Sequence, residues 1–198
     1  MYFKSIFDPI TAFFGLLILS PLFLLIAILI KIKMPDGPVF FKQKRVGQFG
    51  KLFVMYKFRT MINAHNGSSV SVKGEIRITP IGAFLRKYKL DELPELLNVL
   101  KGEMSFVGPR PDVAGYADKL KGTDLDILKL KPGITGPASL KYINEEEILS
   151  IVDDPIKYND EVIYPDKVRI NLKYLNELSF WLDCKIIFYT LIGKRIDF

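Results

Sequence analysis

Two adjacent acidic residues, Asp91 and Glu92, are the strongest candidates for chemistry in this 198-residue chain. Leucines at positions 93, 96, 97 and 100 predict a helix that begins near Asp91 and ends at Gly102. Asp91 could then be a simple N-cap, because Asp is favoured at that position. The same place also suits catalysis, since free amides at a helix start attract phosphate and Arg86 lies five residues upstream. A carboxylate held there could attack phosphorus, and its neighbour could bind a hard cation through oxygen.

Arg110 is a second candidate, because it stands between Pro109 and Pro111. Pro111 disfavours helical backbone at Arg110, and Pro109 restricts the entry to it. A rigidly presented guanidinium suits bidentate recognition of a diphosphate. The alternative is a turn whose arginine simply faces solvent.

The elements that would position these residues begin with a predicted β-hairpin. Two strands, Val39–Arg45 and Leu52–Arg59, are expected around a turn over residues 47–50. Period-two alternation places Lys57 and Arg59 on one face of the second strand, either as substrate-binding cations or as a solvated strand face. Thr79 and Pro80 then predict the start of a short helix over Ile81–Lys89, which carries Arg86.

Two Gly/Pro-rich stretches, residues 108–112 and 131–137, predict ordered loops because apolar residues flank both of them. Leu178–Ile192 predicts a C-terminal helix. Trp181, Lys185 and Tyr189 favour a position on the bilayer surface, and a buried core helix is the alternative.

The scarce residue types narrow the chemistry further. The net charge of +6 suits nucleic acid, anionic lipid or phosphorylated substrates and does not choose among them. The single Cys184 excludes an internal disulfide. The single His65, in the polar run Asn63–Lys73, argues against a His-based triad or a His/Cys zinc site. An enzyme built on this chain would therefore use carboxylates, Lys, Arg, Ser, Tyr or a metal held by oxygen.

An N-terminal apolar segment, Pro9–Ile30, contains no charged residue and would reach about 33 Å as a straight helix. Ser20-Pro21 lies at its midpoint, where proline removes a backbone hydrogen bond and bends the helix. A kinked spanning helix, followed by basic residues on the cytoplasmic side, is the commoner arrangement. A re-entrant helix that dips into one leaflet and returns is the alternative.

A resemblance emerges from the central motif. Residues 91–111, DELPELLNVLKGEMSFVGPRP, resemble the core motif of the bacterial sugar transferases, the monotopic polyprenyl-phosphate phosphoglycosyl transferases. Residues 57–61, KFRTM, and 131–136, KPGITG, resemble two further blocks of that family, as does the apolar segment with its Ser-Pro break. The resemblance covers essentially the whole chain. The short length resembles the minimal catalytic form, such as the transferase that begins N-linked glycan assembly with N,N'-diacetylbacillosamine phosphate.

The resemblance implies an α+β, mostly helical, monotopic membrane protein. Residues 1–35 would form a re-entrant helix broken at Ser20 and Pro21. Residues 36–198 would form a catalytic domain, with a small β-hairpin and interfacial amphipathic helices, on the cytoplasmic face of the bacterial inner membrane.

The resemblance also implies roles for individual residues. Asp91 would be the nucleophile, Glu92 would serve a Mg²⁺ site, and Arg110 would contact the phosphates of a nucleotide sugar. The further residues expected at the substrate site are Arg86, Lys57, Arg59 and Pro109. Pro137 departs from the family pattern, in which many members carry an aliphatic residue, and this leaves the sugar-side contacts open.

The implied reaction moves a sugar 1-phosphate from a UDP-sugar, such as UDP-N,N'-diacetylbacillosamine or another N-acetylated sugar, to undecaprenyl phosphate. UMP leaves through a covalent aspartyl intermediate. Membrane lipid is an expected partner, and nucleic acid is not. Two alternatives stay open: a direct ternary-complex transferase whose acids only bind Mg²⁺, and a non-catalytic membrane-anchored protein that binds anionic lipid.

Overall fold

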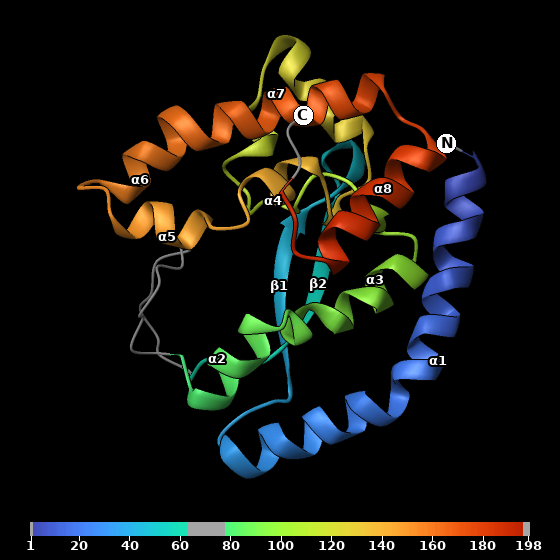
Figure 1. Ribbon diagram of the computed structural model, residues 1–198, viewed down its shortest axis with the longest axis vertical. Coiled ribbons are helices and arrows are strands. Elements are labelled where there is room, and N and C mark those ends of the chain that lie inside the picture. The colour runs from blue at the N-terminus through green and yellow to red at the C-terminus, as the bar shows by residue number, and fades with distance from the viewer. Residues whose placement is uncertain (1, 63–77, 196–198) are drawn as a thin grey trace.

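The computed structural model describes residues 2–62 and 78–195, and the polar run Asn63–Lys73 with His65 lies outside these ranges. Within them the chain is mostly helical and contains two small two-stranded sheets (Figure 1). The elements, in order, are α1 (Tyr2–Lys33), β1 (Phe40–Val46), η1 (Gln48–Gly50), β2 (Leu52–Phe58), α2 (Pro80–Lys87), η2 (Leu90–Glu95), α3 (Leu96–Leu100), β3 (Ser105–Val107), η3 (Ala117–Lys119), η4 (Gly122–Lys129), β4 (Gly133–Thr135), α4 (Pro137–Lys141), α5 (Glu145–Ser150), α6 (Pro155–Tyr158), η5 (Asn159–Ile163), α7 (Tyr164–Asn176) and α8 (Phe180–Leu191). The predicted mostly helical α+β class is confirmed.

The predicted hairpin is also confirmed. Strands β1 and β2 pair antiparallel from Phe40↔Phe58 to Val46↔Leu52. One face of β2 buries Phe53 and Met55 against α3 in a core that includes Val99. Because side chains alternate along a strand, Lys57 points to the same side as these two residues, towards η2 and α3.

Helix α2 begins as the sequence predicts. The Thr79 hydroxyl accepts a hydrogen bond from the amide of Gly82 at 3.0 Å, and Pro80 is the first helical residue. The helix ends at Lys87, two residues before the predicted end. Gly82 lies directly against the segment that follows β2: a Cβ atom there would be 1.9 Å from the Thr60 carbonyl oxygen. Only glycine therefore allows α2 to approach this closely.

The two Gly/Pro-rich stretches lie side by side. Strands β3 and β4 pair in parallel through Ser105↔Gly133 and Val107↔Thr135. The amide of Gly108 extends this pairing by donating to the Thr135 carbonyl at 2.9 Å. A Cβ at Gly108 would be 2.2 Å from the Lys131 carbonyl oxygen, so the backbones are in direct contact. The two stretches are thus ordered loops, as predicted.

Helix α1 is continuous through Pro9 and Pro21 but bends sharply between two legs (Figure 1). Pro21 has no N–H group, so the carbonyl of Leu17 loses its usual helical donor. The Ser20 hydroxyl donates to that carbonyl at 2.8 Å instead. The Ser-Pro pair therefore removes one backbone hydrogen bond of the helix and replaces it with a hydrogen bond from the Ser20 side chain.

Both legs of α1 pack on the rest of the protein. In the first leg, the ammonium of Lys4 lies 2.7 Å from Asp183 of α8, and the carboxylate of Asp8 accepts a 2.6 Å hydrogen bond from the Ser105 hydroxyl of β3. In the second leg, Ile26 and Ile30 share a buried cluster with residues of β2 and α2. The two ends of α1 are therefore held by one body.

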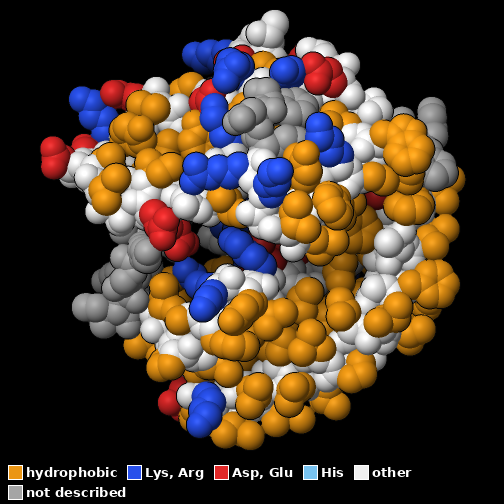
Figure 2. All heavy atoms as spheres, in the orientation of Figure 1, with side chains coloured by type: hydrophobic (Ala, Val, Ile, Leu, Met, Phe, Trp, Pro, Cys, Tyr) orange, Lys and Arg blue, Asp and Glu red, His pale blue; other side chains and the backbone are white. Residues whose placement is uncertain are grey.

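The outward surface of α1 is apolar. Lys4–Lys33 is long and apolar enough to cross a membrane by length and composition, although only 11% of its apolar window is buried in the protein. Apolar side chains cover the lower face of the molecule around this helix (Figure 2). Helix α8 is buried on one side and exposed on the other: Ile186 is fully buried, whereas Trp181 and Leu191 are largely exposed.

Candidate active site

Asp91 and Glu92 lie on η2, a short 3₁₀ helix that follows α2. The chain enters it through Lys89, whose backbone is left-handed with φ of 56°. Lys89, not Asp91, occupies the N-cap position, and its side chain makes no capping bond. The interpretation of Asp91 as an N-cap is therefore wrong, because the left-handed turn places the N-cap two residues earlier, at Lys89. Both carboxylates are buried despite lying in the first turn.

Asn98 fixes η2 and α3 against the hairpin. Its side-chain oxygen accepts from the amide of Tyr56 at 3.1 Å, and its side-chain nitrogen donates to the carbonyl of Val54 at 2.7 Å. These bonds use the free edge of β2, which β1 leaves unpaired. They place the carboxylates of η2 beside Lys57.

Glu92 is held by two cations. The Lys57 ammonium lies 2.7 Å and the Arg110 guanidinium 2.6 Å from the same oxygen, Oε1 of Glu92. Burial alone would raise the pKa of Glu92, but Arg110 and Lys57 together hold it well below its usual range. Glu92 is therefore a permanent anion, and it joins three segments that are distant in the sequence.

Asp91 has the opposite environment. Its Oδ1 atom is buried and has no hydrogen-bond partner among the described residues. Burial raises the pKa of Asp91, and the neighbouring charge of Glu92 raises it further, while Lys57 and Arg86 oppose this shift. A buried carboxylate oxygen without a donor is poorly stabilised as an anion, which makes it a better nucleophile.

Glu95 is a third acid that the sequence analysis missed. Its side chain is 2% exposed, and its Oε1 lies 3.2 Å from the Lys57 ammonium. Burial raises the pKa of Glu95 to about 7, and the charge of Glu92 contributes to the rise. Glu92 and Glu95 are three residues apart, the spacing that brings side chains together on a 3₁₀ helix, so the spacing could have revealed it.

The structure presents Arg110 from a well-braced loop. The carbonyl of Pro109 accepts from the amide of Gly133 at 2.8 Å, and the carbonyl of Pro111 accepts from the guanidinium of the partly buried Arg45 at 3.2 Å. The side chain of Arg110 keeps 47% exposure while its Nη2 binds Glu92. Glu92 thus fixes one nitrogen of the guanidinium, and the rest of the group stays accessible. Pro109 contributes through its backbone carbonyl.

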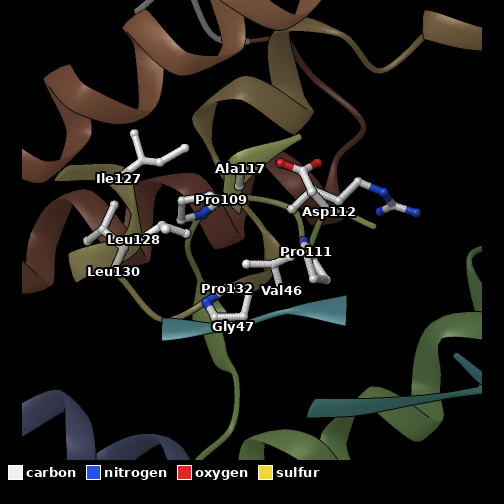
Figure 3. Close-up of a pocket in the computed structure, with 11 residues that line it drawn as sticks. Val46, Gly47, Pro109, Pro111, Asp112, Ala117, Ile127, Leu128, Leu130 and Pro132 are labelled. Carbon is white, nitrogen blue, oxygen red and sulfur yellow. The ribbon is translucent and has the colours of Figure 1, made fainter. Parts of the chain in front are cut away.

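A small cavity lies behind this loop (Figure 3). Pro109, Pro111 and Pro132 line it together with residues at the end of β1 and along η4. Its volume is about 20 Å³, which is room for about one water molecule. The cavity is therefore part of the packing that supports Arg110 and not a sugar or nucleotide pocket.

The side chain of Arg86 lies near the carboxylates of the site, whereas that of Arg59 does not. The Nε of Arg86 donates to the Thr60 hydroxyl at 3.1 Å, and its charge acts on Asp91. Arg59 instead donates to the carbonyls of Met34 and Asp36, just beyond the end of α1. The strand ends at Phe58, so the alternation that grouped Arg59 with Lys57 stops before it. The structure brings Lys57, but not Arg59, to the carboxylates.

The acids at the site fit a divalent cation that also binds substrate. Among residues 2–62 and 78–195, no group of three or more His, Cys, Asp or Glu side chains could hold a metal ion alone. Mg²⁺ commonly uses one or two carboxylates and completes its shell with water and substrate phosphates. The anionic Glu92 supplies one such carboxylate, beside the buried and unpartnered Oδ1 of Asp91.

Comparison with known proteins gives consistent relatives. The family model described as bacterial sugar transferase matches residues 1–194. The UDP-glucose:undecaprenyl-phosphate glucose-1-phosphate transferase of Klebsiella pneumoniae is 38% identical over 100% of this chain and 41% of that protein. The UDP-N-acetylgalactosamine-undecaprenyl-phosphate N-acetylgalactosaminephosphotransferase of Aeromonas hydrophila is 34% identical over 96% of this chain and 43% of its own length. The uncharacterized sugar transferase EpsL of Bacillus subtilis is 37% identical over 96% of this chain and 86% of its own length. The chain thus spans about two fifths of the first two relatives.

Glu95 generates a prediction about pH and stability. Its pKa of about 7 exceeds the ordinary 4.5, so the folded protein binds this proton more tightly than the unfolded chain does. The resulting stabilisation is complete below the ordinary pKa and is lost as pH rises through about 7. Asp112, whose pKa burial raises to about 6, acts in the same direction. The unfolding temperature should therefore fall between about pH 5 and about pH 8.

Glu95→Gln should flatten this fall, because the amide carries no titrating proton. The matched control is Glu161→Gln, at an exposed position of η5, which should keep the wild-type slope. The measurement is thermal unfolding in detergent micelles across the pH range. An identical slope in wild type and Glu95→Gln would contradict the assignment.

Proposed function

The chain belongs to the bacterial sugar transferase family, and from that premise we propose that it transfers a sugar 1-phosphate from a UDP-sugar to undecaprenyl phosphate. UDP-sugar and undecaprenyl phosphate are the substrates that the names of its relatives print. The observation that carries the proposal is the contrast between the two adjacent acids. Glu92 is neutralised by Lys57 and Arg110, whereas Asp91 keeps a buried oxygen free to react.

The proposed reaction has two displacements at one phosphorus atom. In the first, a carboxylate oxygen of Asp91 attacks the phosphorus that bears the sugar. The bond from that phosphorus to the bridging oxygen breaks, and UMP leaves with this oxygen and the electron pair. In the second, a phosphate oxygen of undecaprenyl phosphate attacks the same phosphorus and releases the Asp91 carboxylate. A covalent step lets two large substrates use one site in turn.

The cations around Asp91 supply the electrostatic part of this mechanism. Negative charge builds up on the departing UMP, and Arg110 can face it with the half of its guanidinium that Glu92 leaves open. Arg86 adds a second cation, whose charge reaches Asp91. Because these groups are held before substrate arrives, little reorganisation is required during the reaction.

We further propose that Mg²⁺ is required. Glu92 would hold the ion together with the donor phosphates, where it would neutralise diphosphate charge, and Asp91 would stay free to attack. EDTA should abolish UMP release and added Mg²⁺ should restore it, while the unfolding temperature measured in parallel stays unchanged. Full activity in excess chelator would exclude the requirement.

The membrane arrangement that we propose is re-entrant. Helix α1 would enter and leave the bilayer on the cytoplasmic face of the inner membrane, with its apolar outer surface in the lipid. The support is that one body holds both ends, through Lys4 with Asp183 and through Met34 with Phe58. A spanning helix would have to break one of these two sets of contacts.

Cysteine labelling tests this topology. In a Cys184→Ser background, Ser5→Cys and Lys33→Cys should both resist an impermeant thiol reagent in intact cells and react after permeabilisation. Each variant is the control for the other, because the two residues lie at opposite ends of α1. Labelling of position 5 alone in intact cells would establish a spanning helix.

Asp91→Asn tests the chemistry. Asn cannot form the acyl phosphate, so turnover should fall by about 10³-fold or more. The fold should survive, since the substitution removes a buried charge whose pKa burial already raises. Asp118→Asn, at an exposed carboxylate, is the matched control and should keep full activity.

A panel of UDP-sugars without acceptor tests the covalent intermediate directly. The correct donor should release about one UMP per site and leave a sugar phosphate on the Asp91 peptide, detectable by intact-protein mass spectrometry. An inactive Asp91→Asn protein combined with no adduct or UMP burst in wild type would favour direct transfer in a ternary complex. An active Asp91→Asn protein would remove Asp91 from the chemistry.

A further inference from the structure

The outward face of α2 carries an exposed aromatic pair. Phe84 is 54% and Tyr88 is 55% exposed, and their ring centroids lie 4.9 Å apart. The opposite face of the same helix is buried through Gly82 and Leu85. One face of α2 is therefore buried, as in an ordinary amphipathic helix. The opposite face presents two large rings to the outside. Leaving two large rings exposed to water is unfavourable, so the pair is a candidate for contact with an apolar ligand.

The pair is close to the proposed nucleophile. Tyr88 precedes Asp91 by three residues, so their Cα atoms lie within about 11 Å of each other. Arg86, between the two rings in sequence, turns inward to Thr60 and acts on Asp91. One helix thus contributes a cation to the site and aromatic surface beside it.

Helix α2 also packs on an element whose outer surface is apolar. The buried side of α2 packs on the second leg of α1, where Leu85 meets Ile26 and Ile30. That leg exposes Leu24, Leu25 and Ile28 on its outer surface. In Figure 2 the apolar surface of the lower face extends from α1 towards α2 and α3.

A cation lies beside one ring of the pair. The ammonium of Lys87 lies 5.4 Å from the centre of the Tyr88 ring. A ligand with a hydrocarbon chain and a phosphate head would match this order, with the chain along the rings and the anion near the cations.

We propose that Phe84 and Tyr88 form the subsite for the first isoprene units of the polyprenol phosphate acceptor. This inference rests on the proposed function and adds the place where the acceptor binds. In the second displacement the acceptor phosphate must reach the phosphorus on Asp91, so the isoprene units next to that phosphate lie a few ångströms away. Tyr88, whose Cα lies within about 11 Å of that of Asp91, brings the apolar surface of the pair to this side of the site.

The double variant Phe84→Ala/Tyr88→Ala tests the subsite. The KM for undecaprenyl phosphate in detergent micelles should rise at least about tenfold. The KM for the UDP-sugar and the size of the acceptor-free UMP burst should stay at their wild-type values. The matched control is Phe13→Ala/Phe14→Ala on α1. Those rings are 52% and 54% exposed with centroids 5.5 Å apart, and their loss should leave the acceptor KM unchanged.

A water-soluble acceptor with two isoprene units, geranyl phosphate, separates acceptor binding from membrane docking. If the rings contact the first isoprene units, the Ala variant should lose affinity for geranyl phosphate as well. If they only dock the enzyme on the bilayer, geranyl phosphate should react equally well with wild type and variant, and the proposal is overturned. Phe84→Leu/Tyr88→Leu keeps apolar surface and should recover most of the affinity. Equal loss in the Leu and Ala variants would show disturbed folding and count against a binding role.

Failure of the proposed function gives a different result. If wild type releases no UMP from any UDP-sugar even when undecaprenyl phosphate is present, the transferase assignment falls and the subsite falls with it. If wild type transfers sugar phosphate while the Phe84→Ala/Tyr88→Ala variant keeps the wild-type acceptor KM, only the subsite is wrong.

Discussion

The candidate site depends on one carboxylate oxygen, Oε1 of Glu92, which binds Lys57 and Arg110 at once. This atom joins β2, η2 and the Pro-Arg-Pro loop, three segments that are separated from one another in the sequence. A buried acid is unfavourable unless it is paired, and removing one partner of a buried pair leaves an uncompensated charge. The two cations and Glu92 are therefore stable only together, and the geometry around Asp91 follows from that requirement.

The same arrangement separates the properties of two neighbouring acids. Glu92 takes the nearby donors, so Asp91 is buried without one at Oδ1. Arg110 and Lys57 lower the pKa of Glu92 against the effect of burial, whereas burial raises the pKa of Asp91. Adjacent groups whose pKa values are pushed apart commonly have different roles in one mechanism. Glu95 adds a third buried acid that shares Lys57, so the protonation of Glu95 changes how strongly Lys57 is drawn to Glu92.

Helix α1 is connected to this site through β3. Asp8 of α1 accepts from the hydroxyl of Ser105, the first residue of that strand, and Lys4 donates to the carbonyl of Val107, the last. Gly108, Pro109 and Arg110 follow directly. The second leg of α1 supports α2, which carries Arg86 and the aromatic pair. Each leg of α1 therefore braces one side of the site, and a change in the bend at Pro21 would be transmitted to both.

Local signals in the sequence determined the apolar N-terminal segment with its Ser-Pro break, the hairpin, the Thr79 cap and the ordered Gly/Pro loops. Each depends on residues within one or two turns, so short-range rules suffice. They also identified Asp91, Glu92, Arg86, Lys57 and Arg110 as candidates. The tertiary structure alone decided which of these meet. It placed Arg59 at the end of α1, moved the cap from Asp91 to Lys89, and added Glu95 through a 3₁₀ rather than an α-helical turn. It also showed both legs of α1 on one body. Burial and ion pairing depend on segments distant in sequence, and only their packing determines which carboxylate is neutralised and which keeps a free oxygen.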